Sequence, residues 1–448
     1  MSSAIELAEI RAEGNRIRYT VHDRSGMRLL KKETVHAWIQ FDHAEEFGLD
    51  LASLPLSVLA IPMSLYLLPV TYYYPVTLRL PVMDEMLHER LPEIRAAYED
   101  VYGRFPESEW GGVFTVRTER NELPAHPSGY GKVVFFSGGV DAVSAGVNNA
   151  GAGSVLVSIP SIESQAKNDG PLREQKYRLI SDFSAAAESP WVLISNNFND
   201  DVFNDGAIQA RLDGILRSEA FRFDGWFGIK YLANMSSAAP LAYALGIPSL
   251  IMGSTFEPLE GEAHTNRDGA APELSDAFAY AGISFAEQDE LRTRRTAKTA
   301  GIIRWCRARG KTVRLWTCFD DRAEQCGVCA KCVRTQLNIL VAGESPRDWG
   351  FALFDERKFS RHIRSYRYWE KNPCWLWDNV DAIDDARTYP QCDEMLHWLK
   401  KVGYREYQRR ARKMLLVRNM ARRLVSVHRW PHYAAAVVRR LRRHRSEK

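Results

Sequence analysis

Ser137, Gly138, Gly139 and Asp141 lie in the stretch "VVFFSGGVDAVSAG", between an apolar run and helix-forming residues. A turn of this composition exposes successive backbone N–H groups, and its glycines let a polyanion approach because they carry no Cβ. The helix that follows adds the positive end of its dipole. The stretch therefore predicts a phosphate cradle in which Asp141 holds Mg²⁺ or caps the helix. The alternative is a tight turn without a ligand, with Asp141 as an N-cap.

Four of the seven cysteines are grouped in "CFDDRAEQCGVCAKCVRT" and are Cys318, Cys326, Cys329 and Cys332. A Cys-x-x-Cys-x-x-Cys run with one further cysteine is sufficient for tetrahedral thiolate coordination of zinc. A [4Fe–4S] cluster uses a similar spacing, and unligated buried thiols are the third interpretation. The missing Cys-Pro partner and the hydrophilic neighbours favour a structural zinc site; these neighbours are Asp320, Asp321 and Lys331.

Strands alternate with helices in the region that contains the Ser-Gly-Gly turn. The predicted strands are 132–137, 154–160, 191–198 and 248–255, and the predicted helices are 141–151, 171–189 and 235–247. Repeated βα units predict an α/β fold with a doubly wound parallel sheet that is covered on both faces. Ligands of such sheets bind beyond the C-terminal ends of the strands, which is where the turn falls.

The flanking regions have a different character. Residues 1–128 read as a β-rich module that ends in a helix over 83–103 and a Pro- and Gly-rich linker. We therefore predict a nucleotide-binding domain with its cysteine site over 129–344 and a helical, basic extension over 345–448.

The composition is that of a globular protein, with 448 residues, 45% hydrophobic and 26% charged, and a net charge of +4. Grouped cysteines argue for metal ligation in a reducing cytosol, and charges near the N-terminus argue against a signal peptide. We therefore expect a cytoplasmic protein that is not transmembrane. One uncharged run, 51–78, is long enough to cross a bilayer, but its four prolines favour short buried or edge strands.

The glycine turn also carries a resemblance. "FFSGGVDAVSA" resembles the pyrophosphatase loop of the PP-loop ATP-dependent enzymes, whose usual form is Ser-Gly-Gly-x-Asp-Ser. Ala142 stands where that family has its second serine, so the hydroxyl contact to pyrophosphate would come from Ser144 or Ser137. Together with "CGVCAKCVRT", in which Arg334 is at the matching place, the chain looks like the 7-cyano-7-deazaguanine synthase family over roughly 132–342.

The resemblance implies a fold, a reaction and a set of residues. The fold would be that of the adenine nucleotide alpha hydrolases, and the cofactors would be ATP, Mg²⁺ and Zn²⁺. The enzyme would adenylate a carboxylate or carbonyl of a 7-deazapurine-like substrate, release pyrophosphate and form a C–N bond. Ser137, Gly138, Gly139, Asp141 and Ser144 would bind ATP and Mg²⁺. Asp141 and Lys298 would be the catalytic residues, because "TAKTAGIIRW" lies where the family has a comparable element; the alternative for Lys298 is a surface lysine.

The substrate is less well specified than the reaction. Glu257, Glu262, His264 and Asp268 lie on the loop expected to face it, although a solvated loop is the alternative for each. Sulfur-inserting PP-loop enzymes need a thiol, for which Cys306, Cys374 and Cys392 are candidates; inert buried cysteines are the alternative.

The C-terminal tail is strongly basic. Residues 401–448 contain 16 Lys or Arg against 2 Glu, and leave 44 basic and 54 acidic groups in the first 400 residues. A basic amphipathic helix binds RNA, an anionic membrane surface or an acidic partner, or packs on the acidic body. Two other functions stay open: a ligase or thiolase that modifies tRNA or a partner protein, and a non-catalytic nucleotide-binding module.

Overall fold

The computed structural model describes residues 3–104, 111–125, 129–160, 170–253, 269–286, 293–318, 324–371 and 373–420. Glu257, Glu262, His264 and Asp268 lie outside these ranges. Within them, eleven strands form one sheet in the order β12-β13-β11-β8-β9-β10-β3-β2-β1-β4-β6. Its strands are β1 (Ala4–Glu13), β2 (Arg16–Asp23), β3 (Thr34–Asp42), β4 (Thr77–Leu80), β6 (Val113–Thr115), β8 (Lys132–Phe135), β9 (Ser154–Ser158), β10 (Trp191–Asn196), β11 (Ser249–Ile251), β12 (Ala279–Tyr280) and β13 (Ile283–Phe285). A separate parallel pair joins β5 (Met83–Asp84) to β7 (Thr118–Glu119).

The sheet is parallel where the sequence predicts βα units. β8, β9 and β10 follow one another in parallel, and β11 pairs in parallel with the other edge of β8. The chain therefore places β9 and β10 on one side of β8 and then places β11 on the other side. In α/β sheets, ligands bind at such a reversal of strand order, beyond the C-terminal ends of the two central strands, which are here β8 and β11.

Alternate residues of β8 face two different cores, as expected for a strand with helices on both sides. Val133 and Phe135 belong to one core, and Val134 and Phe136 belong to the other. The first core includes α1 (Leu56–Leu67), α2 (Val70–Tyr73), α3 (Glu85–Tyr102), α6 (Phe198–Asp201), α7 (Asp205–Asp213), α8 (Glu219–Ile229), α9 (Tyr231–Met235), α10 (Ala239–Ala244) and α11 (Pro272–Ala277). The second includes α4 (Val140–Asn149), α5 (Gly170–Ala187), α12 (Arg295–Arg309), α13 (Ala330–Val341), α14 (Glu356–Arg364), α15 (Cys374–Asp381) and α16 (Asp393–Val402). The predicted α/β architecture is confirmed.

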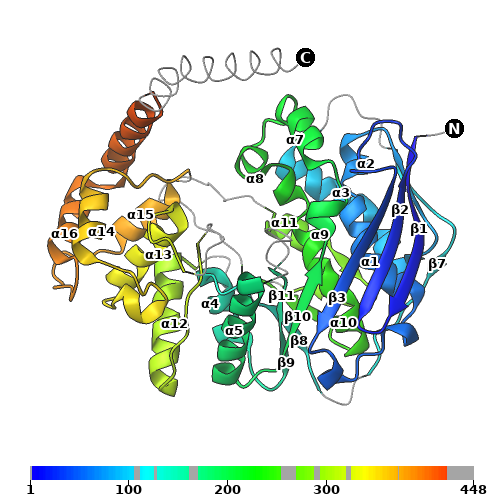
Figure 1. The fold of residues 1–448 in the computed structure, drawn as a ribbon, viewed down its shortest axis with the longest axis horizontal. Coiled ribbons are helices and arrows are strands. Elements are labelled where there is room, and N and C mark those ends of the chain that lie inside the picture. The colour runs from blue at the N-terminus through cyan, green and yellow to red at the C-terminus, as the bar shows by residue number, and fades with distance from the viewer. Residues whose placement is uncertain are drawn as a thin grey trace, which may run out of the picture.

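The N-terminal strands continue the same sheet. β1, β2 and β3 form an antiparallel meander, and β3 pairs antiparallel with β10 through Leu193 and Asp42. Figure 1 shows these strands in blue at one end of the molecule, with the helices of the C-terminal region at the other end. The division into three regions stays a prediction, and the first two share an unbroken sheet.

The prediction of short strands over 51–78 is wrong for most of that run, because it folds into α1 and α2. Pro55 and Pro69 precede these helices, where a missing N–H is tolerated, and Pro62 lies inside α1. Two of the prolines therefore mark the starts of helices, and the third lies within one. Leu56–Tyr73 is long and apolar enough to cross a membrane, but 94% of this segment is buried inside the protein, as in a core helix.

The C-terminal region is helical, as predicted. Beyond α16, residues 404–420 form a further helix whose Tyr407 and Ala411 are buried against the body. Past Ala411 the helix projects from the body (Figure 1), and its apolar side chains Met414, Leu416, Val417 and Met420 are exposed. Over residues 412–420, then, the expectation that the tail packs on the body is not met.

Candidate functional site

The loop between β8 and α4 has the geometry of a cradle. Gly138 has a φ of 84°, a conformation that L side chains rarely adopt, and a Cβ there would lie 3.3 Å from both Leu179 and Trp316. Gly139 is the N-cap of α4 and has no side chain that could cap it. Asp141 is therefore not the N-cap of α4, and the N–H groups in the first turn of a helix have no partner within the helix.

Gly253, two residues after the end of β11, packs against the first turn of α4. A Cβ at this position would lie 2.3 Å from the backbone carbon of Asp141. Only glycine lets the end of β11 approach the first turn of α4 so closely.

We expect Gly253→Ala to lower the free energy of unfolding by about 1–3 kcal/mol, because the new methyl group must push two backbone segments apart. Gly153→Ala is the matched control, since nothing lies within 4 Å of its added Cβ. Urea unfolding of the two variants tests this; equal stabilities would contradict the close approach.

Asp141 lies between two cationic side chains of α12. Arg295 donates to its carboxylate at 2.8 and 3.1 Å, and the Lys298 Nζ lies 3.3 Å from its Oδ1. The Lys298 side chain is 1% exposed, so the surface-lysine interpretation is wrong. The structure brings Asp141 and Lys298 together, as the sequence predicts, and adds Arg295.

A third cation reaches the loop from α5. The Lys176 Nζ donates to the carbonyl oxygen of Ser137 at 2.8 Å. Lys176, Arg295 and Lys298 bring three positive charges to a loop whose carboxylate is Asp141, and the N-terminus of α4 adds to this potential. This arrangement suits a ligand that carries several negative charges.

The two serines differ in their placement. Ser137 is exposed in the loop, whereas Ser144 is 5% exposed within α4. Ser137 is therefore the better placed of the two to supply the hydroxyl that Ala142 lacks.

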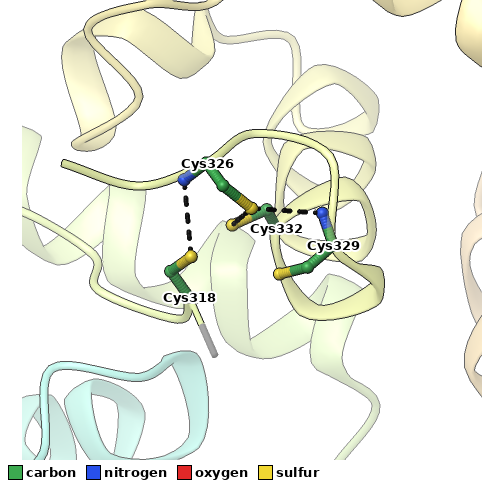
Figure 2. Close-up of side chains that lie close together, drawn as sticks. All are labelled: Cys318, Cys326, Cys329 and Cys332. Carbon is green, nitrogen blue, oxygen red and sulfur yellow. Dashed lines mark hydrogen bonds between the residues drawn. The ribbon is translucent and has the colours of Figure 1, made fainter. Parts of the chain in front are cut away.

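The four grouped cysteines meet in space, with their sulfur atoms within 4.8 Å of one another (Figure 2). Cys326 Sγ and Cys332 Sγ are 3.9 Å apart, close to the roughly 3.8 Å expected for thiolates around a tetrahedral zinc with Zn–S bonds of about 2.3 Å. Cys329 is the N-cap of α13, and Cys332 lies in its first turn. The donor set can hold a metal ion such as zinc.

The electrostatics of the cluster favour a cation. Its own backbone stabilises thiolates, because the N–H groups of Cys326 and Cys329 donate to the sulfurs of Cys318 and Cys326 at 3.4 and 3.3 Å. Without a metal, the hydrogen bond that the Cys332 thiol donates to Cys329, burial and the neighbouring thiols raise the pKa of Cys332 well above its usual range. Ionising all four thiols would therefore require a cation such as zinc between them.

The cysteine cluster and the glycine loop share one segment of chain. The Trp316 N–H donates to the carbonyl oxygen of Gly138 at 2.6 Å, two residues before Cys318. The buried Gln325 side chain accepts from the Thr317 N–H and donates to the carbonyl oxygen of Leu315, both at 2.9 Å. The segment 315–318 therefore connects the cysteine cluster to the glycine loop.

Comparisons do not identify the chain. No protein-family model, curated protein or solved structure matches it. The function therefore has to be inferred from the geometry of these two sites.

The cysteines outside the cluster do not offer a reactive thiol. Cys306, Cys374 and Cys392 are at most 3% exposed. Burial raises the pKa of Cys306, and raises that of Cys392 to about 11. Since the thiolate is the nucleophile, this placement favours the inert alternative for all three.

Several residues of the site were not predicted from the sequence. Arg295 could have been predicted, since it precedes Lys298 by three residues and the two share a helix face. Lys176 and Trp316 had no local signal, because their contacts with the loop depend on how distant segments pack. Arg334, singled out by the resemblance, is buried, with its Nη1 3.4 Å from the Glu370 carboxylate and its guanidinium 3.9 Å from the Trp375 ring centre.

Proposed function

We propose that this protein is an ATP-dependent enzyme of the PP-loop type. It would adenylate a carboxylate or carbonyl of a 7-deazapurine-like substrate, release pyrophosphate and form a C–N bond. The observation that carries the proposal is the glycine loop beside the ends of β8 and β11, with Lys176, Arg295 and Lys298 around it. Polyphosphates bind where a helix N-terminus, exposed N–H groups and cations converge.

The residues have distinct roles in this proposal. Gly138 and Gly139 admit the phosphates, and Ser137 adds a hydroxyl donor. Arg295 and Lys298 neutralise the charge that develops on the leaving pyrophosphate. Asp141 keeps both cations in place, and its carboxylate would be the ligand for Mg²⁺, which shields phosphate charge when bound.

The proposed reaction needs no oxidant or reductant. A carboxylate oxygen of the substrate attacks the α-phosphorus of ATP, the bond to the pyrophosphate oxygen breaks, and an acyl adenylate forms. Ammonia or an amine then displaces AMP and loses a proton, which leaves an amide.

The cysteine cluster would have a structural role. A Cys₄ zinc site has no open coordination position, so it stabilises the fold and does not activate water. Its reduced thiolates suit a cytoplasmic location, which belongs to the same proposal.

The test measures pyrophosphate release from ATP by the zinc-loaded full chain, with 7-deazapurine carboxylic acids and ammonia. We expect release that depends on the acid and a product mass that corresponds to amide formation. Absence of ATP binding would overturn the proposal. Binding without turnover on any acid would indicate a non-catalytic nucleotide-binding module.

A macromolecular acceptor is the second candidate, favoured by the exposed apolar and basic end of the 404–420 helix. Leu416, Val417 and Met420 are exposed beside basic side chains of this helix, as on a surface that binds a partner. A chain that ends after Ala411 keeps the buried contacts of Tyr407 and Ala411. If tRNA or a protein is the acceptor, this chain retains ATP binding and loses only the modification of the macromolecule.

A further inference from the structure

α15, in the C-terminal region outside the resemblance, caps the helix that carries Arg295 and Lys298. The first residue before α12, Arg294, provides no side-chain cap. The Asp378 carboxylate of α15 takes this role, since it accepts from the Thr296 N–H at 3.0 Å and from its hydroxyl at 2.6 Å. Asp378 is 1% exposed, so this cap is shielded from water. A cap supplied from another element fixes the start of a helix just as a local one does.

Two tryptophans of α15 hold the arginines at this helix start. The Arg294 guanidinium lies 4.1 Å from the Trp377 ring centre and pairs with Asp381 at 2.5 Å. The Arg295 guanidinium lies 5.0 Å from the Trp375 ring centre. α15 therefore supplies side-chain partners for three successive residues at the start of α12, which are Arg294, Arg295 and Thr296.

Trp375 lies between two charged groups of different elements. Arg334 of α13 is 3.9 Å from its ring centre, and Arg295 of α12 is the second cation near the same ring. Each guanidinium has its own carboxylate, Glu370 for Arg334 and Asp141 for Arg295. Trp375 is 8% exposed, so these cation–π contacts are largely desolvated, which is where they are strongest.

These contacts also order the arginine side chains at the start of α12. An arginine at a helix start has many rotamers, and ordering it near a polyanion lowers the binding affinity by the entropy that is lost. With Thr296 capped and Arg295 resting on Trp375, the guanidinium already points to Asp141 beside the loop. Lys298 lies one turn further along the same helix, so the cap fixes its position as well.

We propose that α15 is a positioning element of the nucleotide site, in which Trp375 and Asp378 set Arg295 and Lys298 against the glycine loop. The inference rests on the proposed function for the identity of the ligand. It makes the C-terminal region part of the binding site for the phosphates of ATP.

The experiment measures the dissociation constants of MgATP and of inorganic pyrophosphate for the zinc-loaded full chain. We expect Trp375→Leu to weaken both by about tenfold, the size of a desolvated cation–π contact. Trp375→Phe keeps an aromatic face and should stay within about threefold of the parent protein. Trp398→Leu is the matched control, because the ring of this half-buried tryptophan lies against Tyr366, Tyr407 and Arg364.

Hydrogen exchange provides a readout that does not depend on the nucleotide. We expect Asp378→Ala to remove the protection of the Thr296 amide, and Asp378→Asn, which keeps an acceptor oxygen, to retain part of it. Should Trp375→Leu fail to fold, Asp378→Ala carries the affinity test.

The outcomes separate the two proposals. A parent protein that binds neither MgATP nor pyrophosphate contradicts the proposed function, while exchange at Thr296 still tests the cap. A parent protein that binds both ligands, with Trp375→Leu and Asp378→Ala binding equally well, overturns the positioning role alone. An unprotected Thr296 amide in the parent protein overturns it as well.

Discussion

Removing the metal from the cysteine cluster is expected to unfold the segment around it and to abolish nucleotide binding. Structural zinc sites contribute about 10–16 kcal/mol of apparent binding free energy at neutral pH, which exceeds the stability of most domains. The loss should extend to the glycine loop, because Trp316 hydrogen-bonds to Gly138 two residues before Cys318. Cys329→Ala, which removes one of the four sulfur atoms, should have the same effect as a chelator.

Three measurements check this expectation: the metal content per chain, hydrogen exchange over 315–341, and the affinity for MgATP. Cys392→Ala is the matched control, since it removes a buried cysteine outside the cluster and should leave the metal bound. Unchanged nucleotide affinity in the metal-free protein would contradict the coupling between the two sites. Stoichiometric iron and sulfide with visible absorbance would replace zinc by a [4Fe–4S] cluster.

The sequence predicts the parallel part of the sheet well, because each of those strands is a short apolar run bounded by turn residues. β8, β9, β10 and β11 all lie within the predicted ranges. The run over 51–78 was misassigned because proline is compatible with a strand end and with a helix start, and only the packing around α1 decides between them. Local pattern carries no information on that packing.

The candidate site also combines residues that can be predicted from the sequence with residues that cannot. Ser137, Gly138, Gly139 and Asp141 are consecutive or nearly so, and the cysteine spacing is equally local, so both could be found in the sequence. Trp375 and Asp378 could not, because their roles arise only when α15 packs against the start of α12. That contact joins residues about 80 positions apart, and no periodicity encodes it.

Lys298→Met is expected to reduce the rate of ATP-dependent pyrophosphate release by about 100-fold or more, the usual effect of removing one preorganised charge from a transition state. The substitution keeps the length and most of the volume of a side chain that is 1% exposed, so the fold should persist. Lys311→Met, an exposed lysine just beyond the C-terminal end of α12, is the matched control and should retain full activity.

A double-mutant cycle with Asp141→Asn distinguishes catalysis from structural pairing. If Lys298 acts only by neutralising the half-buried Asp141 carboxylate, adding Lys298→Met to Asp141→Asn should cost no further activity, because the charge that the lysine neutralises is already gone. If Lys298 acts on the phosphates, the double variant should be slower than Asp141→Asn alone. The fold must be intact in every variant, which denaturant unfolding establishes. Equal activity of the double variant and Asp141→Asn would therefore remove Lys298 from the catalytic residues and leave Arg295 and the glycine loop to bind the anion.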